Sequence, residues 1–176
     1  NIIKPKAASY FSFSKGVSSQ KNPSSLMGSI ALMRQTFLDA EWYAAQNNQT
    51  NLSYTAFNNQ QELPHVFIAN DELDYSRIYK IADEFEIDFI IKGNGKEYSR
   101  IDEVSATEFS VIIPLNFPNA YDISNPETAQ WISLNKLKDW ETAPYNPAIL
   151  ANHEIKFCIT SSGLDKKSNF ISNLRL

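Results

Sequence analysis

The sequence predicts an α/β protein built from parallel strands with flanking helices. Short apolar runs alternate with stretches whose apolar residues recur at helical spacing, which is the pattern of βαβ units. The runs are continuously apolar, which is typical of strands buried on both faces. The centres of three successive runs, Ile68, Ile90 and Ile112, are each 22 residues apart. Such regular units fit either a partial (β/α)8 TIM-barrel-like arrangement or an open α/β sheet.

Residues 1–62 are expected to form an N-terminal loop and helix. Residues 1–22 are polar and rich in Ser and Lys, so we expect a loop with at most one short strand. The segment Asn22-Pro23-Ser24-Ser25 offers a polar cap and a proline for the start of a helix. An apolar stripe at helical spacing carries this helix to about Ala45; its members are Leu26, Ile30, Met33 and Phe37. Residues 47–61 show no periodicity and are expected to be a surface connection.

Residues 63–176 are expected to form four consecutive strand–helix units. The predicted strands cover residues 65–69, 87–91, 109–115 and 155–160. The first predicted helix has an apolar face formed by Ile78, Ile81, Ala82 and Phe85, and a shorter second helix contains Tyr98, Ile101 and Val104. A third helix is expected over about 127–140. Asn146-Pro147 begins a short fourth helix, and residues 165–176 are expected to form an amphipathic fifth one. The last helix has no capping glycine and the chain begins with Asn1 rather than Met, so we expect a fragment of a longer protein.

Composition excludes several functional classes. The 176 residues are 43% hydrophobic and 20% charged, which is ordinary for a globular domain or part of one. The formal charge of −4 does not favour nucleic-acid binding, which needs a basic face. No apolar stretch reaches the length of about 18 residues that a membrane span needs. The single cysteine, Cys158, excludes an intramolecular disulfide and, in an apolar run, is expected in the core.

The candidate site lies where the predicted strands end, because α/β proteins bind ligands at the carboxyl ends of parallel strands. The polar residues there are Asn70, Asp71, Lys92, Asn94, Asn116, Thr160 and Ser161. Their amides and hydroxyls suit hydrogen bonding to a polar solute such as a peptide or a sugar. Only Asp71 among them is an ordinary zinc ligand, so this segment is expected to hold no metal. His65 and His153 precede their strands and are expected at the surface or as caps.

Two motifs invite chemical interpretations that the sequence does not favour. The segment Lys92-Gly93-Asn94-Gly95 would cradle an anion if its N–H groups were free. Tyr98 stands where the third glycine of a dinucleotide fingerprint would fall, so we expect a tight turn instead. Ser161 has neither the G-x-S-x-G elbow of a nucleophile nor a histidine placed as its base. No catalytic residue is therefore assigned.

Five segments of the chain resemble amidohydrolase-superfamily proteins related to imidazolonepropionase. They are NPSSLMGSIALMRQTF at 22–37, LPHVFIAN at 63–70, DFIIKGNGKEY at 88–98, VIIPLNFP at 111–118 and FCITSSGL at 157–164. The resemblance spans nearly the whole chain. It implies a (β/α)8 barrel of which this chain supplies roughly the second half, with the four apolar runs as strands five to eight. It also implies a metal-dependent hydrolase that cleaves C–N bonds.

The metal positions implied by the resemblance carry other residues here. Where these amidohydrolases have a metal-binding histidine at the end of strand five, this chain has Ile68. Their histidine at strand six corresponds to residues 91–94, around Lys92. Their Thr-Asp pair at strand eight corresponds to Thr160-Ser161. The resemblance places its His-x-His pair before Asn1, so zinc or another divalent metal would belong to the full-length protein.

Three hypotheses follow. The first is an amidohydrolase-like, metal-dependent enzyme seen as a fragment. The second is a non-catalytic barrel segment that binds a polar solute or has a structural role. The third is a self-contained small α/β domain with an unrelated role. The expected partners are the remainder of its own barrel or a second copy of the chain, and a small polar ligand. The Asn- and Ser-rich loops lean towards an extracytoplasmic setting, such as the periplasm.

Overall fold

A computed structural model describes residues 6–16, 19–46 and 50–175 and confirms the α/β class. One all-parallel sheet contains five strands in the order β1-β2-β3-β4-β5, so neighbours in the sheet are also consecutive in the chain. The strands are β1 (Ser9–Ser12), β2 (His65–Ile68), β3 (Phe89–Lys92), β4 (Ser110–Pro114) and β5 (Phe157–Thr160). The last four confirm the four predicted strands, and β1 is the short strand allowed for in the N-terminal loop.

The helices alternate with these strands. They are α1 (Leu26–Ala45), α2 (Leu52–Asn58), α3 (Asp74–Phe85), α4 (Ile101–Ala106), α5 (Pro126–Ala129), α6 (Leu134–Thr142), α7 (Asn146–Asn152) and α8 (Asn169–Leu174), with 3-10 turns η1 (Glu97–Arg100) and η2 (Ala143–Tyr145). Helix α1 begins as predicted, because the Ser25 hydroxyl oxygen caps it by accepting the N–H of Gly28 at 3.1 Å. In the described part of the chain, no helix combines the length and the apolar character of a membrane span.

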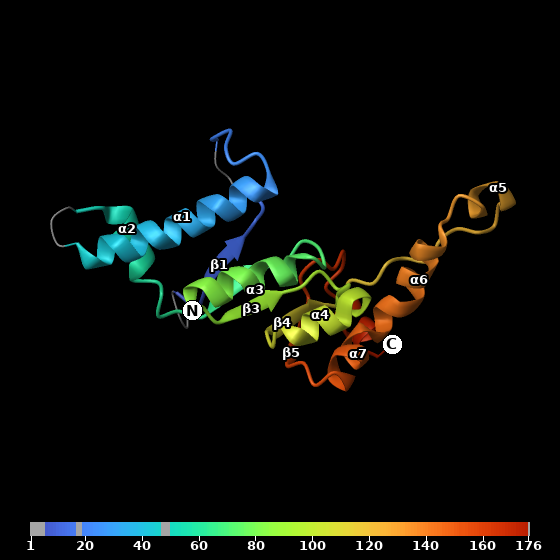
Figure 1. Cartoon of the computed structure of the whole chain (residues 1–176). Helices are drawn as coiled ribbons and strands as arrows, with labels where there is room; N and C mark the ends of the chain where they lie inside the picture. The colour runs from blue at the N-terminus through green and yellow to red at the C-terminus, as the bar shows by residue number, and fades with distance from the viewer. Residues whose placement is uncertain (1–5, 17–18, 47–49, 176) are drawn as a thin grey trace.

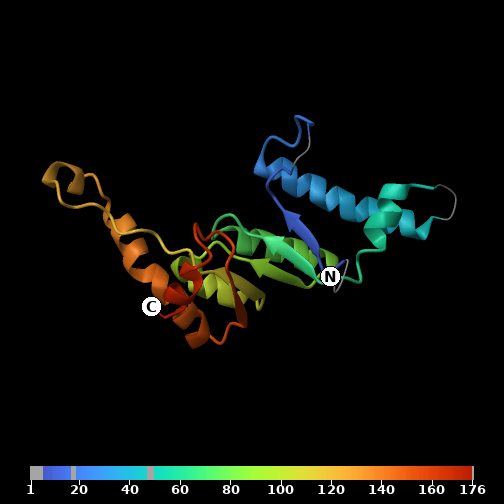
Figure 2. The ribbon, with the colours of Figure 1, turned by 180° about the vertical axis from the view of Figure 1, so that it is seen from behind.

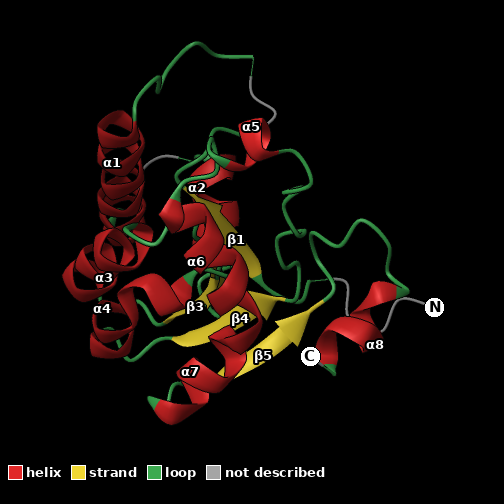
Figure 3. Ribbon diagram, turned by 90° about the vertical axis from the view of Figure 1, so that its right-hand side faces the viewer, coloured by secondary structure: helices red, strands yellow, loops and turns green. Residues whose placement is uncertain are grey.

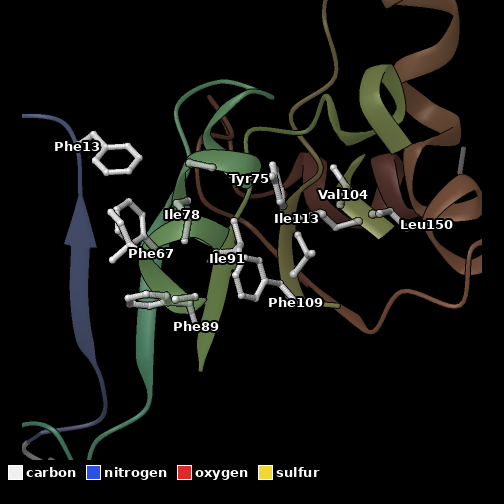
Figure 4. Packing of buried hydrophobic residues seen from close by; sticks show 14 of the residues in the cluster. Phe13, Phe67, Tyr75, Ile78, Phe89, Ile91, Val104, Phe109, Ile113 and Leu150 are labelled. Carbon is white, nitrogen blue, oxygen red and sulfur yellow. The ribbon is translucent and has the colours of Figure 1, made fainter. Parts of the chain in front are cut away.

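The hydrophobic core lies between the sheet and the helices on one of its sides. Figure 3 shows α1, α3, α4 and α7 along that side of the sheet. Sheet residues such as Phe67, Phe89 and Ile113 meet Ile78 of α3 and Leu150 of α7 in one buried cluster (Figure 4). The rings of Phe67 and Phe89 lie 5.4 Å apart, edge to face. This packing explains why the apolar stripe predicted for α3 forms a helix: it is the stripe that the sheet buries.

The opposite side of the sheet has much less cover. Along β3, Ile91 is fully buried whereas Ile90 and Lys92 are half-buried. Ile68, Lys92, Ile112 and Cys158 are in register across β2 to β5, so their side chains share one side of the sheet. We call this side the open face; it carries Tyr10, Val66, Ile68, Ile90, Lys92, Ile112 and Cys158, of which Val66 is buried.

One prediction about burial is wrong and another holds only in part. Burial on both faces holds for His65, Val66 and Phe67 of β2, whereas Ile90 in β3 is only half-buried. Cys158 is exposed rather than part of the core. The reason is that consecutive strand order places the helices of these units on one side, so alternate residues of each strand project towards the side without helices.

The predicted surface connection over 47–61 contains a helix, α2, which the absence of apolar periodicity concealed. Asn51 caps it, since its side-chain oxygen accepts the N–H groups of Ser53 and Tyr54 at 3.0 and 3.3 Å. The ring of Phe57 packs 5.4 Å from that of Phe37 in α1. Hydrogen bonds also hold α2 against α1: the Tyr54 hydroxyl donates to Asp39 at 3.1 Å and the Asn58 amide donates to the Ala40 carbonyl at 3.0 Å. Residues 47–49 lie outside the described residues.

The insertion between β4 and β5 also differs from its prediction. The single helix expected over 127–140 is divided into α5 and α6, because Ser133 starts a new helix by accepting the N–H of Lys136 at 3.4 Å. The segment that contains α5 projects away from the sheet in both views of the chain (Figures 1 and 2). At the C-terminal end, α8 covers only part of the predicted 165–176 helix.

Candidate functional site

The predicted site residues lie along one edge of the sheet. All five strands are parallel, so their carboxyl ends share an edge, and Asn70, Asn94, Asn116 and Ser161 each follow a strand end there. Ile68 and Ser161, two of the positions at which the resemblance implies metal ligands, are also at this edge. The sequence therefore predicted the location of the polar residues correctly.

Asparagine side chains connect the ends of the first three strands. The Asn70 amide nitrogen donates to the Ser14 hydroxyl at 2.9 Å. The Asn94 amide nitrogen donates to the Asn70 carbonyl at 3.2 Å. These two hydrogen bonds link the segments after β1, β2 and β3, which are far apart in the sequence.

Asp71 takes part in the start of α3. One oxygen accepts the Leu73 N–H at 2.8 Å, and the carboxylate pairs with Arg77 at 3.0 Å. The buried Asp74 accepts the Asn70 N–H at 2.9 Å and also pairs with Arg77, at 2.8 Å. These contacts, chiefly the hydrogen bond with Asp74, raise the pKa of the Arg77 guanidinium. Asp71 therefore serves to order the turn.

Lys92 spans the open face near the carboxyl edge. Its ammonium donates to the Ser162 hydroxyl at 2.9 Å, across β4, which lies between β3 and β5. No carboxylate of the described residues forms a salt bridge with it. An ammonium has three N–H donors, so Lys92 keeps donors for a polar or anionic group on a solute.

The turn after β3 is ordered by a buried carboxylate that the sequence analysis missed. Glu97 is fully buried and accepts hydrogen bonds from the Tyr75 hydroxyl at 3.1 Å, the Gly95 N–H at 3.1 Å and the Asn146 amide at 2.6 Å. Burial, followed by the charge of Glu97, raises the pKa of Tyr75 well above its ordinary value. A Cβ at Gly93 would lie 2.0 Å from a Glu97 carboxylate oxygen, so only glycine fits there.

This cluster excludes the anion-cradle interpretation of the turn. The N–H groups of Gly93, Gly95 and Lys96 bind the Ile112 carbonyl, the Glu97 carboxylate and the Asn94 side chain, respectively. The alternative, a tight turn, is the one that the structure shows. A signal for the buried carboxylate was present, because Glu97 lies four residues before Ile101, in the apolar stripe of that short helix.

A polar hollow of about 410 Å³ lies at the carboxyl ends of β4 and β5. Its lining includes Asn116, Phe117, Asn119, Asp165, Asn169 and Asn173. Asn173 of α8 donates to the Leu115 carbonyl at 2.7 Å, which attaches α8 to the end of β4. Figure 3 shows α8 near the arrowhead of β5. Four asparagine side chains thus gather around one hollow, and Asn116 is the only one of them predicted as a site residue.

The remaining predicted residues lie next to this hollow. Thr160 is half-buried, and its hydroxyl oxygen accepts the Ser162 N–H at 3.2 Å. Ser161 is exposed. Gly163 lines the hollow with a φ of +81°, and a Cβ there would lie 2.9 Å from the Asn116 amide nitrogen. The turn after β5 can therefore approach Asn116 closely only because it contains glycine.

The residues at the strand ends do not fit a divalent metal. Ile68 has no donor atom, a lysine ammonium such as that of Lys92 has no lone pair to offer, and the Ser161 hydroxyl is a weak ligand. Within the described residues, no group of three or more His, Cys, Asp and Glu side chains is arranged to hold a metal ion.

The two histidines lie away from this edge. His65 begins β2 at the amino end, as predicted, but it is buried rather than at the surface, with its ring 5.5 Å from that of Phe11. Burial lowers the pKa of His65. His153 is the C-terminal cap residue of α7, which confirms its predicted capping position.

Comparison with known proteins gives no relative for this chain. No protein family, curated protein or solved structure matches it.

Proposed function

We propose that this chain is a non-catalytic binding module for a small polar solute, taken up in the polar hollow. The observation that carries the proposal is the hollow itself, about 410 Å³ at the carboxyl edge and lined by four asparagine side chains. Pockets that bind small molecules have volumes from about 300 Å³ upwards. The position agrees with the edge at which parallel sheets bind their ligands.

The lining favours a neutral solute with several hydroxyl or amide groups. Each asparagine amide both donates and accepts hydrogen bonds, as do the hydroxyls of a sugar or the amides of a peptide. Asp165 is the one charged residue among the described residues that line the hollow. Phe117 adds an aromatic surface for the apolar side of the solute. We therefore propose a sugar or polyol first and a short peptide second.

We also propose that the sheet is a segment of a (β/α)8 barrel. Consecutive strand order and helices along one side support a barrel segment, because a doubly wound sheet reverses its strand order. The open face would then line the barrel interior. The outer edges of β1 and β5 have no partner among the described strands. Unpaired edges favour association, so the partner would be the remainder of the barrel or a second copy.

An amidohydrolase-like hydrolase of C–N bonds is the second candidate. Its support is that Ile68, Lys92 and Thr160-Ser161 end or follow strands at the same edge, as the resemblance implies for its metal ligands. Since these residues do not fit a metal, this segment would contribute scaffold and the ligands would come from other residues. Metal analysis and an amide-hydrolysis assay on the full-length protein test this candidate. Stoichiometric metal with metal-dependent hydrolysis would support it and would contradict the non-catalytic proposal.

Calorimetric titration with monosaccharides, polyols and dipeptides tests the binding proposal. We expect saturable binding of one of these classes. Asn116→Leu keeps the side-chain size and removes two hydrogen-bonding groups, so it should weaken binding by about tenfold. The matched control is Asn152→Leu, at the exposed end of α7 and outside the hollow. Absence of saturable binding to all three classes, or equal weakening by both substitutions, would contradict the proposal.

A further inference from the structure

A second cavity lies at the β1 end of the sheet, opposite the β4 and β5 end that carries the polar hollow. It is enclosed by β1, the loop that follows β1, and α1. Its volume is about 340 Å³. Its apolar walls are Phe11 and Phe13 of the β1 segment, Leu32, Met33 and Phe37 of α1, and Phe57 of α2. None of these residues lines the polar hollow. We call it the apolar cavity.

A hollow with more polar walls adjoins the apolar cavity. A neighbouring hollow of about 360 Å³ shares Phe13, Ser14 and Ser29 with it, among others. The walls of this second hollow, which we call the serine hollow, also include Ser24, Ser25, Asn70 and Asp71. The Asn70 amide nitrogen donates a hydrogen bond to the Ser14 hydroxyl at 2.9 Å. Since Asn70 follows the end of β2, the serine hollow reaches the carboxyl edge of the sheet. One end of the combined space is therefore apolar and the other is polar.

We propose that this combined space binds a small amphipathic molecule, with an apolar ring or short chain in the apolar cavity and an uncharged hydroxyl or amide head in the serine hollow. A cavity of about 150 Å³ holds a benzene molecule. The apolar cavity is about twice that size, which suits a phenylalkyl group or a bicyclic ring.

The charges around the serine hollow favour an uncharged head. Lys15, Asp71 and Asp74 line it, and both carboxylates are already paired with Arg77. The two carboxylates are balanced by the charges of Arg77 and Lys15 together, which leaves no net charge of either sign around the serine hollow. The serine hydroxyls and the Asn70 amide both donate and accept hydrogen bonds, as an alcohol or amide head requires.

The test uses 4-phenylbutan-1-ol as the probe, with 4-phenylbutyrate and 4-phenylbutylamine as charged counterparts of the same shape. Calorimetry on the unmodified chain should show saturable binding of the alcohol, and about tenfold weaker binding of either charged probe. Methyl NMR signals of Met33 and Leu32 should shift during the same titration. This second readout needs no substitution and so does not depend on the folding of a variant.

Leu32→Trp fills the apolar cavity and should weaken alcohol binding by at least about tenfold. Leu32 is 54% exposed, so the larger side chain is tolerated in the fold. Leu38→Trp is the matched control, since Leu38 is on the same helix, is 48% exposed and does not line the cavity. Asn116→Leu should leave alcohol binding unchanged, which separates this proposal from that of the polar hollow.

Three results would overturn the inference. The first is no saturable binding of the alcohol together with unshifted Met33 and Leu32 methyl signals. The second is loss of binding in Leu38→Trp equal to that in Leu32→Trp. The third is equal affinity for all three probes, which would refute the uncharged head.

Discussion

Replacing Glu97 by alanine should strongly destabilise the fold, because one buried carboxylate satisfies donors from three separate segments. Glu97→Ala removes the acceptor of the Tyr75 hydroxyl in α3, the Gly95 N–H in the turn after β3 and the Asn146 amide in α7. An unsatisfied buried donor costs about 1–3 kcal/mol. The three costs are coupled and do not add fully, so we expect a loss of about 3–5 kcal/mol. That is a large share of the about 5–15 kcal/mol that holds a typical domain together.

Urea unfolding followed by fluorescence or circular dichroism measures this loss. The matched control is Glu103→Ala in α4, where an exposed carboxylate pairs with the exposed Arg100. Surface ion pairs contribute about 1 kcal/mol or less, so the control should change the free energy of unfolding by no more than that. Glu97→Gln keeps the shape and one acceptor oxygen, so its loss should fall between the two. A loss in Glu97→Ala no larger than in Glu103→Ala would refute the structural role of this cluster.

Three further predictions follow from single side chains. Since burial lowers the pKa of His65, its contribution to stability is present above the ordinary pKa of about 6.5 and is lost as pH falls towards the lower, folded value. His65→Gln should therefore flatten the fall in unfolding free energy between about pH 7 and pH 5, and an unchanged slope would contradict this. Burial, followed by the charge of Asp139, raises the pKa of Tyr98 to about 12. Tyr98 should therefore add little phenolate absorbance up to about pH 11, so the folded wild-type and Tyr98→Phe proteins should have the same phenolate absorbance up to that pH. A smaller absorbance in the variant at pH 11 would count against the burial of Tyr98. Cys158 is exposed on the open face, so a thiol reagent should label it in the folded chain nearly as fast as in urea; strong protection in native dilute solution would show that this face is covered.

The elements that the sequence predicted best are those whose apolar residues repeat strongly. The four strands from β2 to β5 and helix α3 appear as predicted, because buried runs and one-sided helical stripes are local consequences of the core that they form. Helix α2 was missed because its contacts with α1 are mostly polar, such as those of Tyr54 with Asp39 and of Asn58 with the Ala40 carbonyl, and its start depends on a cap at Asn51. Polar contacts leave no apolar periodicity in the sequence.

The site shows the same division between local and distant information. The carboxyl-edge location of Asn70, Lys92 and Asn116 follows from strand direction, which βα alternation predicts. The polar hollow does not, because Asn169 and Asn173 reach it only through the packing of α8 near the end of β4. The exposure of Cys158 was not predicted, because its continuously apolar run is typical of burial on both faces, whereas the strand order places β5 at the end of the sheet.

The side-chain amide signals of the asparagines give the most direct test of the polar hollow as a binding site. In ¹H–¹⁵N NMR spectra recorded during a titration with the sugar, polyol or dipeptide that calorimetry identifies, we expect the amide signals of Asn116, Asn169 and Asn173 to shift together and to saturate at one affinity. The signal of Asn152, outside the hollow, should not move. The proposed site would be contradicted if the signals of all three asparagines stayed unchanged, or if the shifted signals belonged to residues away from β4 and β5.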